Sequence, residues 1–333
     1  MARWITEAGV RFYSLHGLTI QARWEGKGIE DEIDQFFSPF PFTKLSCLND
    51  PVHMHLKFTT SDIPWAVPKQ TSKPLHCYGL SIFKADDYVY LTDGLSVFQL
   101  QPQQGTGLLT LHSSFREKPL LSKCNFFLIG LIHLLSRFRL YDLHAAGFIR
   151  DGTGCLLLGE SGSGKSSMTL SMVRQGWYYT SDDAILLKSS ADGVEALSFR
   201  KKFYLDPVLI HHYSEIAPYL EGPTNGKRGK RFLDLDLVYP DQFYPDFLPN
   251  VLIYTSIVSQ PESMLTPIDQ TSSLIRLMKQ SASLFFNREA VKAHLDALKQ
   301  LVNQTDSFEL IAGRDLYEEP EKISEVLSVV EGV

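Results

Sequence analysis

The sequence predicts an α/β protein with a β-rich amino-terminal domain at residues 1–122 and a second domain at residues 123–333. Short segments of alternating apolar and polar residues, separated by prolines, occupy the first third of the chain. A helical period of apolar residues begins near residue 123. From there to about residue 312, strand-like and helix-like segments alternate, which is typical of an α/β domain.

The composition excludes several classes of protein. With 44% hydrophobic and 12% aromatic residues in 333, the chain can build a large core and is not a disordered tail. A net charge of −6 gives no overall attraction for nucleic acid or an anionic membrane, so neither is expected as a partner. The four cysteines are scattered singly, which favours a reduced, cytoplasmic setting. The longest apolar run has only about ten residues, where a membrane span needs roughly twenty.

In the amino-terminal region, the segments HMHLKFTT and YGLSIFKADDYVYLTDGLSVFQL are predicted to be strands joined by tight turns. The turns fall at residues 85–87 and 92–94, where aspartates and a glycine stand between apolar runs. His53 and His55 lie on one face of a strand, and without a third ligand nearby we interpret them as strand residues. This region contains no recognisable catalytic constellation.

A helix follows the β-rich region. Asn125 is its expected N-cap, and the next residues, FFLIGLIHLLSRFRL, are apolar around almost the whole circumference. We therefore expect this helix to be buried between the two domains.

A glycine-rich segment carries the strongest functional signal. It matches the pattern G-x-x-x-x-G-K-[ST], a strand-like run precedes it, and a helix stopped by Gly176 follows it. The loop amides and the helix N-terminus are expected to bind phosphate, Lys165 to reach the β- and γ-phosphates, and Ser166 to bind Mg²⁺. The predicted nucleotide-binding residues are Gly159, Glu160, Ser161, Gly162, Ser163, Gly164, Lys165, Ser166 and Ser167.

The segment before the loop predicts the position of a histidine. Asp151 and Gly152 form a two-residue hairpin turn between strands at 146–150 and 153–158. If Arg150 pairs with Thr153, His144 lies opposite Gly159, beside the predicted phosphate site. It is either a functional imidazole there or a strand-end residue bonded to the backbone.

Asp182 and Asp183 follow the next strand. The helix after the loop advances about 16 Å, and the strand 177–181 returns about the same distance toward the loop. In a right-handed βαβ unit this strand end lies beside the loop, where a carboxylate suits Mg²⁺ or a hydroxyl awaiting deprotonation. The alternative is a solvated turn.

A basic stretch follows farther along the chain. Lys227, Arg228, Lys230 and Arg231 stand among glycines, either as a loop that closes over phosphates or as a solvated surface loop.

The order of these motifs resembles the HPr kinase/phosphorylase-like P-loop kinases, a group related in fold to phosphoenolpyruvate carboxykinases. The resemblance covers about residues 143–187, through His144, the loop GESGSGKS and Asp182. It implies ATP and Mg²⁺ as cofactors, Asp182 as the general base supported by His144, and Ser166 and Asp183 as metal-binding residues. It also implies a homo-oligomer.

The resemblance is incomplete, because the glycine-rich signature of the bifunctional bacterial enzyme is missing and the first domain differs from its regulatory domain. Some members of the group with a β-rich front half phosphorylate peptides such as lasso-peptide precursors. The sequence therefore predicts a kinase acting on a serine or threonine of a protein or peptide. The alternatives are a kinase of a small metabolite such as free serine, and a non-catalytic nucleotide-binding interaction module.

Overall fold

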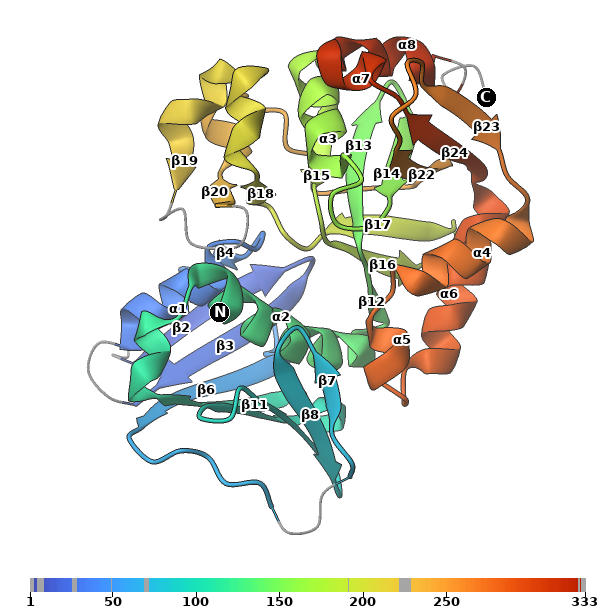
Figure 1. The fold of residues 1–333 in the computed structure, drawn as a ribbon. Helices are drawn as coiled ribbons and strands as arrows, with labels where there is room; N and C mark the ends of the chain where they lie inside the picture. Colours follow the sequence, from blue (N-terminus) through green and yellow to red (C-terminus); the bar gives the residue numbers. More distant parts are fainter. Residues whose placement is uncertain are drawn as a thin grey trace. The chain divides into compact units, whose positions relative to one another are not determined.

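The chain forms two compact units, Met1–Leu140 and Tyr141–Val333, in a computed structural model (Figure 1). The structure describes residues 3–4, 9–25, 29–48, 50–68, 72–190, 192–221, 229–328 and 330. It is a mixed α/β protein with several sheets. The helix expected to open the second domain belongs to the first unit, so the boundary falls after Leu140 and not after residue 122.

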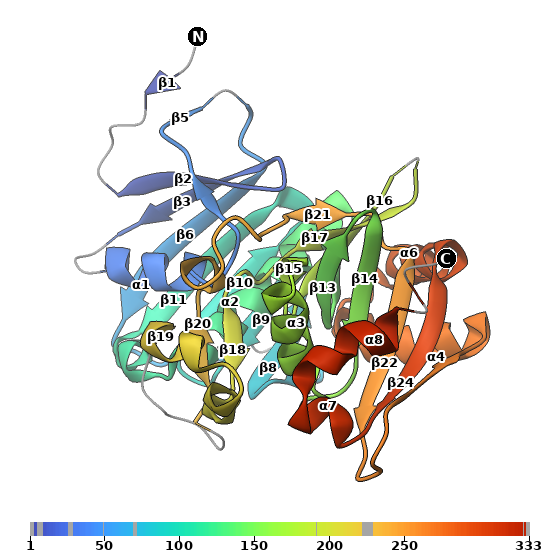
Figure 2. The same cartoon turned by 90° about the horizontal axis from the view of Figure 1, so that it is seen from above.

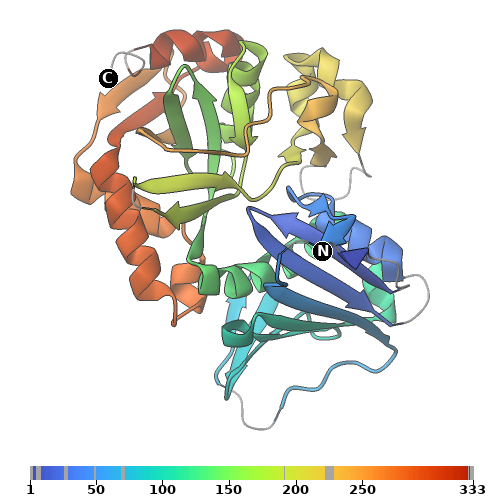
Figure 3. The same ribbon diagram turned by 180° about the vertical axis from the view of Figure 1, so that it is seen from behind.

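The first unit is built on a nine-stranded sheet in the order β4-β2-β3-β6-β11-β10-β9-β8-β7. Most neighbouring strands are antiparallel, but β6 runs parallel to both β3 and β11. Figure 3 shows this sheet in blue to teal from behind. Its strands are β2 (Val10–Leu15), β3 (Leu18–Trp24), β4 (Thr43–Lys44), β6 (Met54–Ser61), β7 (Leu75–Cys77), β8 (Leu80–Ala85), β9 (Tyr88–Thr92), β10 (Val97–Gln101) and β11 (Thr106–His112), and a separate pair joins β1 (Arg3–Trp4) to β5 (Cys47–Leu48).

Two helices, α1 (Ile29–Phe37) and α2 (Leu120–Leu135), cover one face of this sheet. Aromatic rings fill the space between them: Phe36 lies 5.2 Å from Phe127 and 6.0 Å from Phe58, centroid to centroid. Phe98 of β10 stacks on Phe127 at 6.2 Å. Burial of these large apolar side chains fixes the helices on the sheet.

Helix α2 begins earlier than predicted. Its N-cap is Pro119, and Asn125 lies inside the helix, so the expectation of an Asn125 cap is wrong. Proline suits a helix start because it lacks the N–H that the first turn leaves unbonded. Among the described residues, one helical stretch, Leu120–Phe138, is long and apolar enough to cross a membrane, and 67% of its apolar window is buried inside the structure, as in a core helix.

The second unit is built on a six-stranded sheet in the order β15-β13-β14-β22-β24-β23. Strands β14, β22 and β24 are parallel, and β13 and β23 run antiparallel to their neighbours. These strands are β13 (Ala145–Arg150), β14 (Thr153–Leu158), β15 (Tyr178–Ser181), β22 (Val251–Ile257), β23 (Met264–Pro267) and β24 (Asp306–Ala312).

Each face of the six-stranded sheet has its own apolar core. Helices α3 (Lys165–Arg174), α7 (Asp315–Glu318) and α8 (Ile323–Leu327) pack on one face, where α3 and α8 are visible in Figure 2. The other face packs on α4 (Gln270–Lys279), α6 (Val291–Gln304), and the hairpin of β16 (Ile185–Ser189) and β17 (Val194–Ser198).

Smaller elements complete this unit. β12 (Leu140–Leu143) and β21 (Asp246–Phe247) extend the β16–β17 hairpin into a four-stranded sheet, and α5 (Ser283–Phe286) precedes α6. A three-stranded sheet consists of β18 (Phe203–Leu205), β19 (Leu220–Glu221) and β20 (Arg231–Leu233).

The predicted hairpin and its register are confirmed. Asp151 and Gly152 both have positive φ, 51° and 84°, as a tight two-residue turn requires. Arg150 pairs with Thr153, and the ladder continues to Ala145 opposite Leu158. His144 precedes Ala145 in the chain, so it lies just beyond the end of this ladder. There it is beside the loop that begins after Leu158.

The connection after the loop differs from the expected βαβ unit. Strand β15 pairs with β13 and not with β14, so the hairpin strand β13 stands between the two strands that α3 connects. Because β13 is antiparallel to both neighbours, β15 still runs in the same direction as β14. The end of β15 therefore lies at the same sheet edge as the glycine-rich loop.

Candidate active site

The glycine-rich loop, residues 159–164, connects the end of β14 to the start of α3. Gly162 and Gly164 have φ values of 90° and 91°, a conformation that glycine adopts without the strain other residues would suffer. Helix α3 is held by Met168 and Met172, which are buried in the core against β14. Its first turn is thereby fixed with its N–H groups at the loop.

Lys165 folds back over the loop. Its ammonium group donates to the carbonyl oxygens of Gly159 at 2.6 Å and Glu160 at 3.2 Å, and it lies 3.1 Å from Nε2 of His144. Since an ammonium can only donate, Nε2 of His144 is the acceptor. Burial lowers the pKa of Lys165, and nearby Lys230 contributes to the lowering while Asp183 and Asp182 oppose it.

His144 connects this lysine to an acid group. With Nε2 accepting, the proton is on Nδ1, which lies 3.0 Å from Oδ1 of Asp183. The other oxygen of Asp183 accepts from Arg200 at 2.5 Å. The chain of contacts therefore runs from Lys165 through His144 and Asp183 to Arg200. The imidazole contacts Asp183. The expected role of His144, support of Asp182 as the general base, would require a contact with Asp182 instead.

Asp182 faces the start of α3. Its Oδ2 accepts from the Ser166 hydroxyl at 3.0 Å and from the backbone N–H of Tyr204 at 3.4 Å. The residue is only 1% exposed, yet its Oδ1 has no hydrogen-bond partner within the described part of the chain. The same holds for the buried Oγ of Ser163 and Nε of Arg200. Unsatisfied buried polar atoms are costly and are typical of sites that complete their bonds with a ligand.

The two neighbouring carboxyl groups have different acidities. Burial raises the pKa of Asp182 to about 6, and the charge of Asp183 adds to this effect. Burial would raise the pKa of Asp183 as well, but the hydrogen bond from His144 and the charge of Arg200 hold it well below its usual range. Asp183 is thus the more acidic and Asp182 the less acidic member of the pair.

The residues fit a Mg²⁺ ion held together with phosphate, and not a metal enclosed by protein alone. Among the described residues, no group of three or more His, Cys, Asp or Glu side chains is placed to hold a metal ion. Mg²⁺ usually takes one or two protein oxygens and keeps water and phosphate oxygens for the rest. The Ser166 hydroxyl would supply one protein oxygen, and Asp183, whose two oxygens each accept one contact, retains lone pairs for a second.

The remaining predicted residues are placed as follows. Glu160 and Ser161 are exposed on the loop, and the carbonyl of Ser167 accepts from Tyr213 at 3.1 Å. Lys227 and Arg228 lie outside the described residues. Lys230 lies over the ring of Tyr204 at 5.6 Å, close enough to Lys165 to affect its pKa.

Arg231 is the last of the predicted basic residues. It lies on β20 of the three-stranded sheet and donates to the carbonyl of Leu220. Arg200 and Tyr204, by contrast, are site residues that sequence reasoning missed. The only signal for Arg200 is the basic run Arg200-Lys201-Lys202 after β17, which is equally common on surfaces.

Comparison with known proteins adds little to this geometry. No family model matches the chain, and no curated protein matches it. A solved structure described as the Hpr(Ser) kinase/phosphatase from Coxiella burnetii is similar at 13% sequence identity and a TM-score of 0.32. The likeness covers 57% of this chain and 93% of that one, and similarity of this size does not establish membership of a family.

Proposed function

We propose that the protein is a Mg²⁺-dependent kinase that transfers the γ-phosphoryl group of ATP to a serine or threonine hydroxyl of a protein or peptide. The observation that carries the proposal is the convergence on one glycine-rich loop of a lysine, a hydroxyl, a histidine and two acid groups of unlike acidity. A nucleotide-binding module needs the loop and the lysine alone. An acid group that titrates near pH 6 with a free oxygen is what proton removal from an acceptor requires.

Each group has a proposed role. The loop amides and Lys165 bind the phosphates, for which Lys165 exchanges a present contact for a phosphate oxygen. Ser166 would hold Mg²⁺ together with phosphate oxygens, with Asp183 as the proposed carboxylate ligand, and the ion would neutralise phosphate charge. Asp182 accepts the proton of the acceptor hydroxyl through Oδ1. His144 positions Asp183 and Lys165 rather than Asp182.

Lys230 is the basic residue best placed to neutralise charge on the transferring group. Its ammonium lies over Tyr204, whose backbone N–H contacts Asp182. A cation there would face the phosphate and the acceptor together. Arg231 is occupied elsewhere and has no proposed role.

The test of the base is the variant Asp182→Asn. We expect its turnover to fall by about 10²- to 10⁴-fold, because general base catalysis contributes about that much. Affinity for Mg·ATP should change by less than about threefold, since the base acts on the acceptor. Stopped-flow binding of a fluorescent ATP analogue and single-turnover transfer separate the two effects. Near-normal turnover would show that Asp182 is not the base.

The test of the acceptor class uses ATP labelled on the γ-phosphate. Incubation with a cell extract, followed by separation of macromolecules from small molecules, is expected to place the label on protein or peptide. A Lys165→Ala control should abolish labelling, because the lysine contacts the transferred group. Label confined to small molecules would favour a metabolite kinase. Tight nucleotide binding without any labelled product would favour an interaction module.

A further inference from the structure

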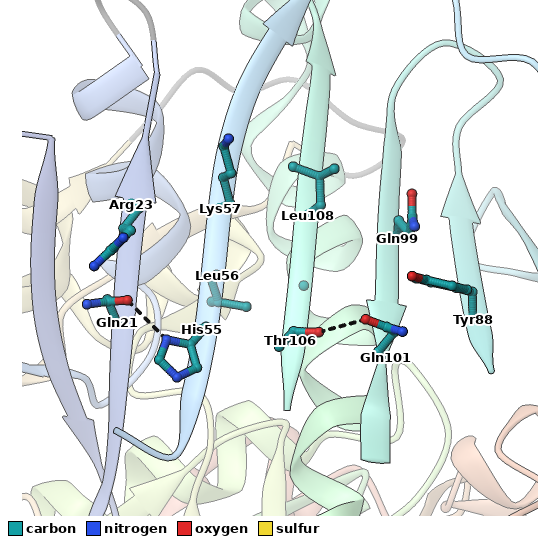
Figure 4. Close-up of a pocket in the computed structure, with 11 residues that line it drawn as sticks. Gln21, Arg23, His55, Leu56, Lys57, Tyr88, Gln99, Gln101, Thr106 and Leu108 are labelled. Carbon is teal, nitrogen blue, oxygen red and sulfur yellow. Dashed lines mark hydrogen bonds between the residues drawn. The ribbon is translucent and has the colours of Figure 1, made fainter. Parts of the chain in front are cut away.

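The face of the nine-stranded sheet opposite α1 and α2 is hollowed and is lined by both polar and apolar side chains. We call it the outer face. It contains a depression of about 330 Å³ whose side chains project from β3, β6, β11, β10 and β9 (Figure 4). The depression is lined by basic, amide and aromatic side chains, and no Asp or Glu belongs to the lining.

The strand register arranges these side chains in rows across the sheet. In one row, Arg23 of β3 lies beside Lys57 of β6, and the pairing continues through Leu108 to Gln99 and Tyr90. The row thus begins with two cations and ends at an aromatic ring. With neighbouring strands about 4.8 Å apart, it spans roughly 19 Å, the length of about six extended residues.

Arg23 and Lys57 form the basic end of the row. Lys57 is paired with Glu25 at 2.6 Å. Arg23 is exposed, and no described residue forms a hydrogen bond or ion pair with its side chain. Next to it, His55 contacts Gln21 at 3.0 Å, and burial together with the charge of Arg23 lowers the pKa of His55. An arginine fork beside amide and imidazole groups is suited to binding a carboxylate.

The aromatic end of the row offers apolar contact. Trp65 stacks on Tyr90 with a centroid distance of 5.5 Å. Ile63 and Val67, in the same segment as Trp65, are 78% and 47% exposed. Large apolar side chains left in solvent beside an aromatic pair are typical of contact surfaces.

We propose that the outer face binds an extended peptide segment that carries a carboxylate at the Arg23 end and an apolar side chain about six residues away, at Tyr90 and Trp65. The amide group of Gln99, between these ends, can bond to the peptide backbone. A nucleic acid fits less well, since one of the two cations in the row, Lys57, is paired with Glu25 and the chain has a net charge of −6.

The binding test uses the full chain and a fluorescein-labelled peptide with two glutamates, a Gly-Ser spacer of about four residues and a phenylalanine. We expect saturable binding in fluorescence anisotropy, and weaker binding by Arg23→Ala of about tenfold or more, as for loss of a charge-assisted hydrogen bond. Gln99→Glu keeps the shape of the side chain and should weaken binding by charge repulsion. Lys84→Ala removes a cation from β8. Lys84 pairs with Val89 and not with Tyr90, so it does not belong to the row, and its loss should change affinity by less than twofold.

Three control probes decide between partners. A peptide with lysines in place of the glutamates, and one with serine in place of phenylalanine, should bind at least about tenfold more weakly. Equal binding of the lysine peptide, or an unchanged affinity of Arg23→Ala with normal circular dichroism, would overturn the proposal. Preferential binding of an oligothymidylate would overturn it in favour of nucleic acid.

Discussion

At the scale of single residues, Asp182 and Asp183 are adjacent in sequence but differ in chemistry. Asp183 contacts His144 and Arg200 through its two oxygens, and both neighbours lower its pKa. Asp182 accepts only from a hydroxyl and a backbone N–H and is almost fully buried. The same side chain thus acquires two acidities from its surroundings, which is how enzymes divide acid and base roles.

The proposed role of Asp182 as general base predicts how phosphoryl transfer depends on pH. Burial raises the pKa of Asp182 to about 6, and the base must be ionised to accept a proton. We therefore expect kcat/KM to be constant above about pH 7 and to fall tenfold per unit below about pH 6. An ordinary aspartate, with a pKa near 4, would keep its activity across this range.

The control for this profile is Asp183→Asn. Removing the neighbouring charge lowers the pKa of Asp182, so the acidic limb should move to lower pH even if the overall rate falls. If the acidic limb of the pH profile does not move in this variant, the group that titrates is ATP or another residue, and not Asp182.

At the scale of elements, the first unit depends on close packing of α2 against the sheet. Gly130 of α2 faces the ring of Phe98, and a Cβ atom there would lie 2.1 Å from the ring. Phe98 is itself fully buried and packed against Phe126 and Phe127, so the ring has no space to retreat. The absence of a side chain at Gly130 sets the distance between helix and strand.

Gly130→Ala is therefore expected to destabilise the protein. Overpacking costs about 1–3 kcal/mol, and we expect it to exceed the gain of about 1 kcal/mol from higher helix propensity. Chemical denaturation would measure the loss. Ser122→Ala, at an exposed position of the same helix, should change stability by less than about 0.5 kcal/mol. The double variant with Phe98→Leu should recover part of the loss, and a strictly additive double variant would contradict the clash.

At the scale of the whole molecule, each unit has a core of its own. The first unit is held by the aromatic cluster around Phe36 and Phe127, and the second by the apolar layers on both faces of its six-stranded sheet. The glycine-rich loop, His144, Asp182 and Asp183 all belong to the second unit. A ligand bound at the loop stabilises the unit that contains it.

Mg·ATP is therefore expected to raise the unfolding temperature of the second unit. At 100 times the Kd, binding contributes about 2.7 kcal/mol, which corresponds to roughly 5–10 °C for a unit of this size. Differential scanning calorimetry measures the shift, and Lys165→Ala should remove most of it. An equal shift in that variant would contradict the assignment of the loop as the phosphate site.

Local patterns predicted a large part of this fold. The Asp151-Gly152 turn determined the β13–β14 register, because a two-residue turn leaves a single pairing, and it placed His144 beside the loop. The glycine spacing predicted the strand, loop and helix in order. The pairing of β15 with β13 was not predictable, since another strand can be inserted between two strands without changing the local pattern of either.

The sequence by itself determined the elements around the loop and which chemical groups stand at their ends, because turns, caps and strand periods depend on neighbouring residues. Only the tertiary structure decided that His144 contacts Asp183, that Arg200 joins them, and that α2 belongs to the first unit. It also decided that Arg23 and Lys57 lie side by side on one face of a sheet. These relations join residues far apart in the chain, and they depend on packing and strand order, which no local pattern encodes.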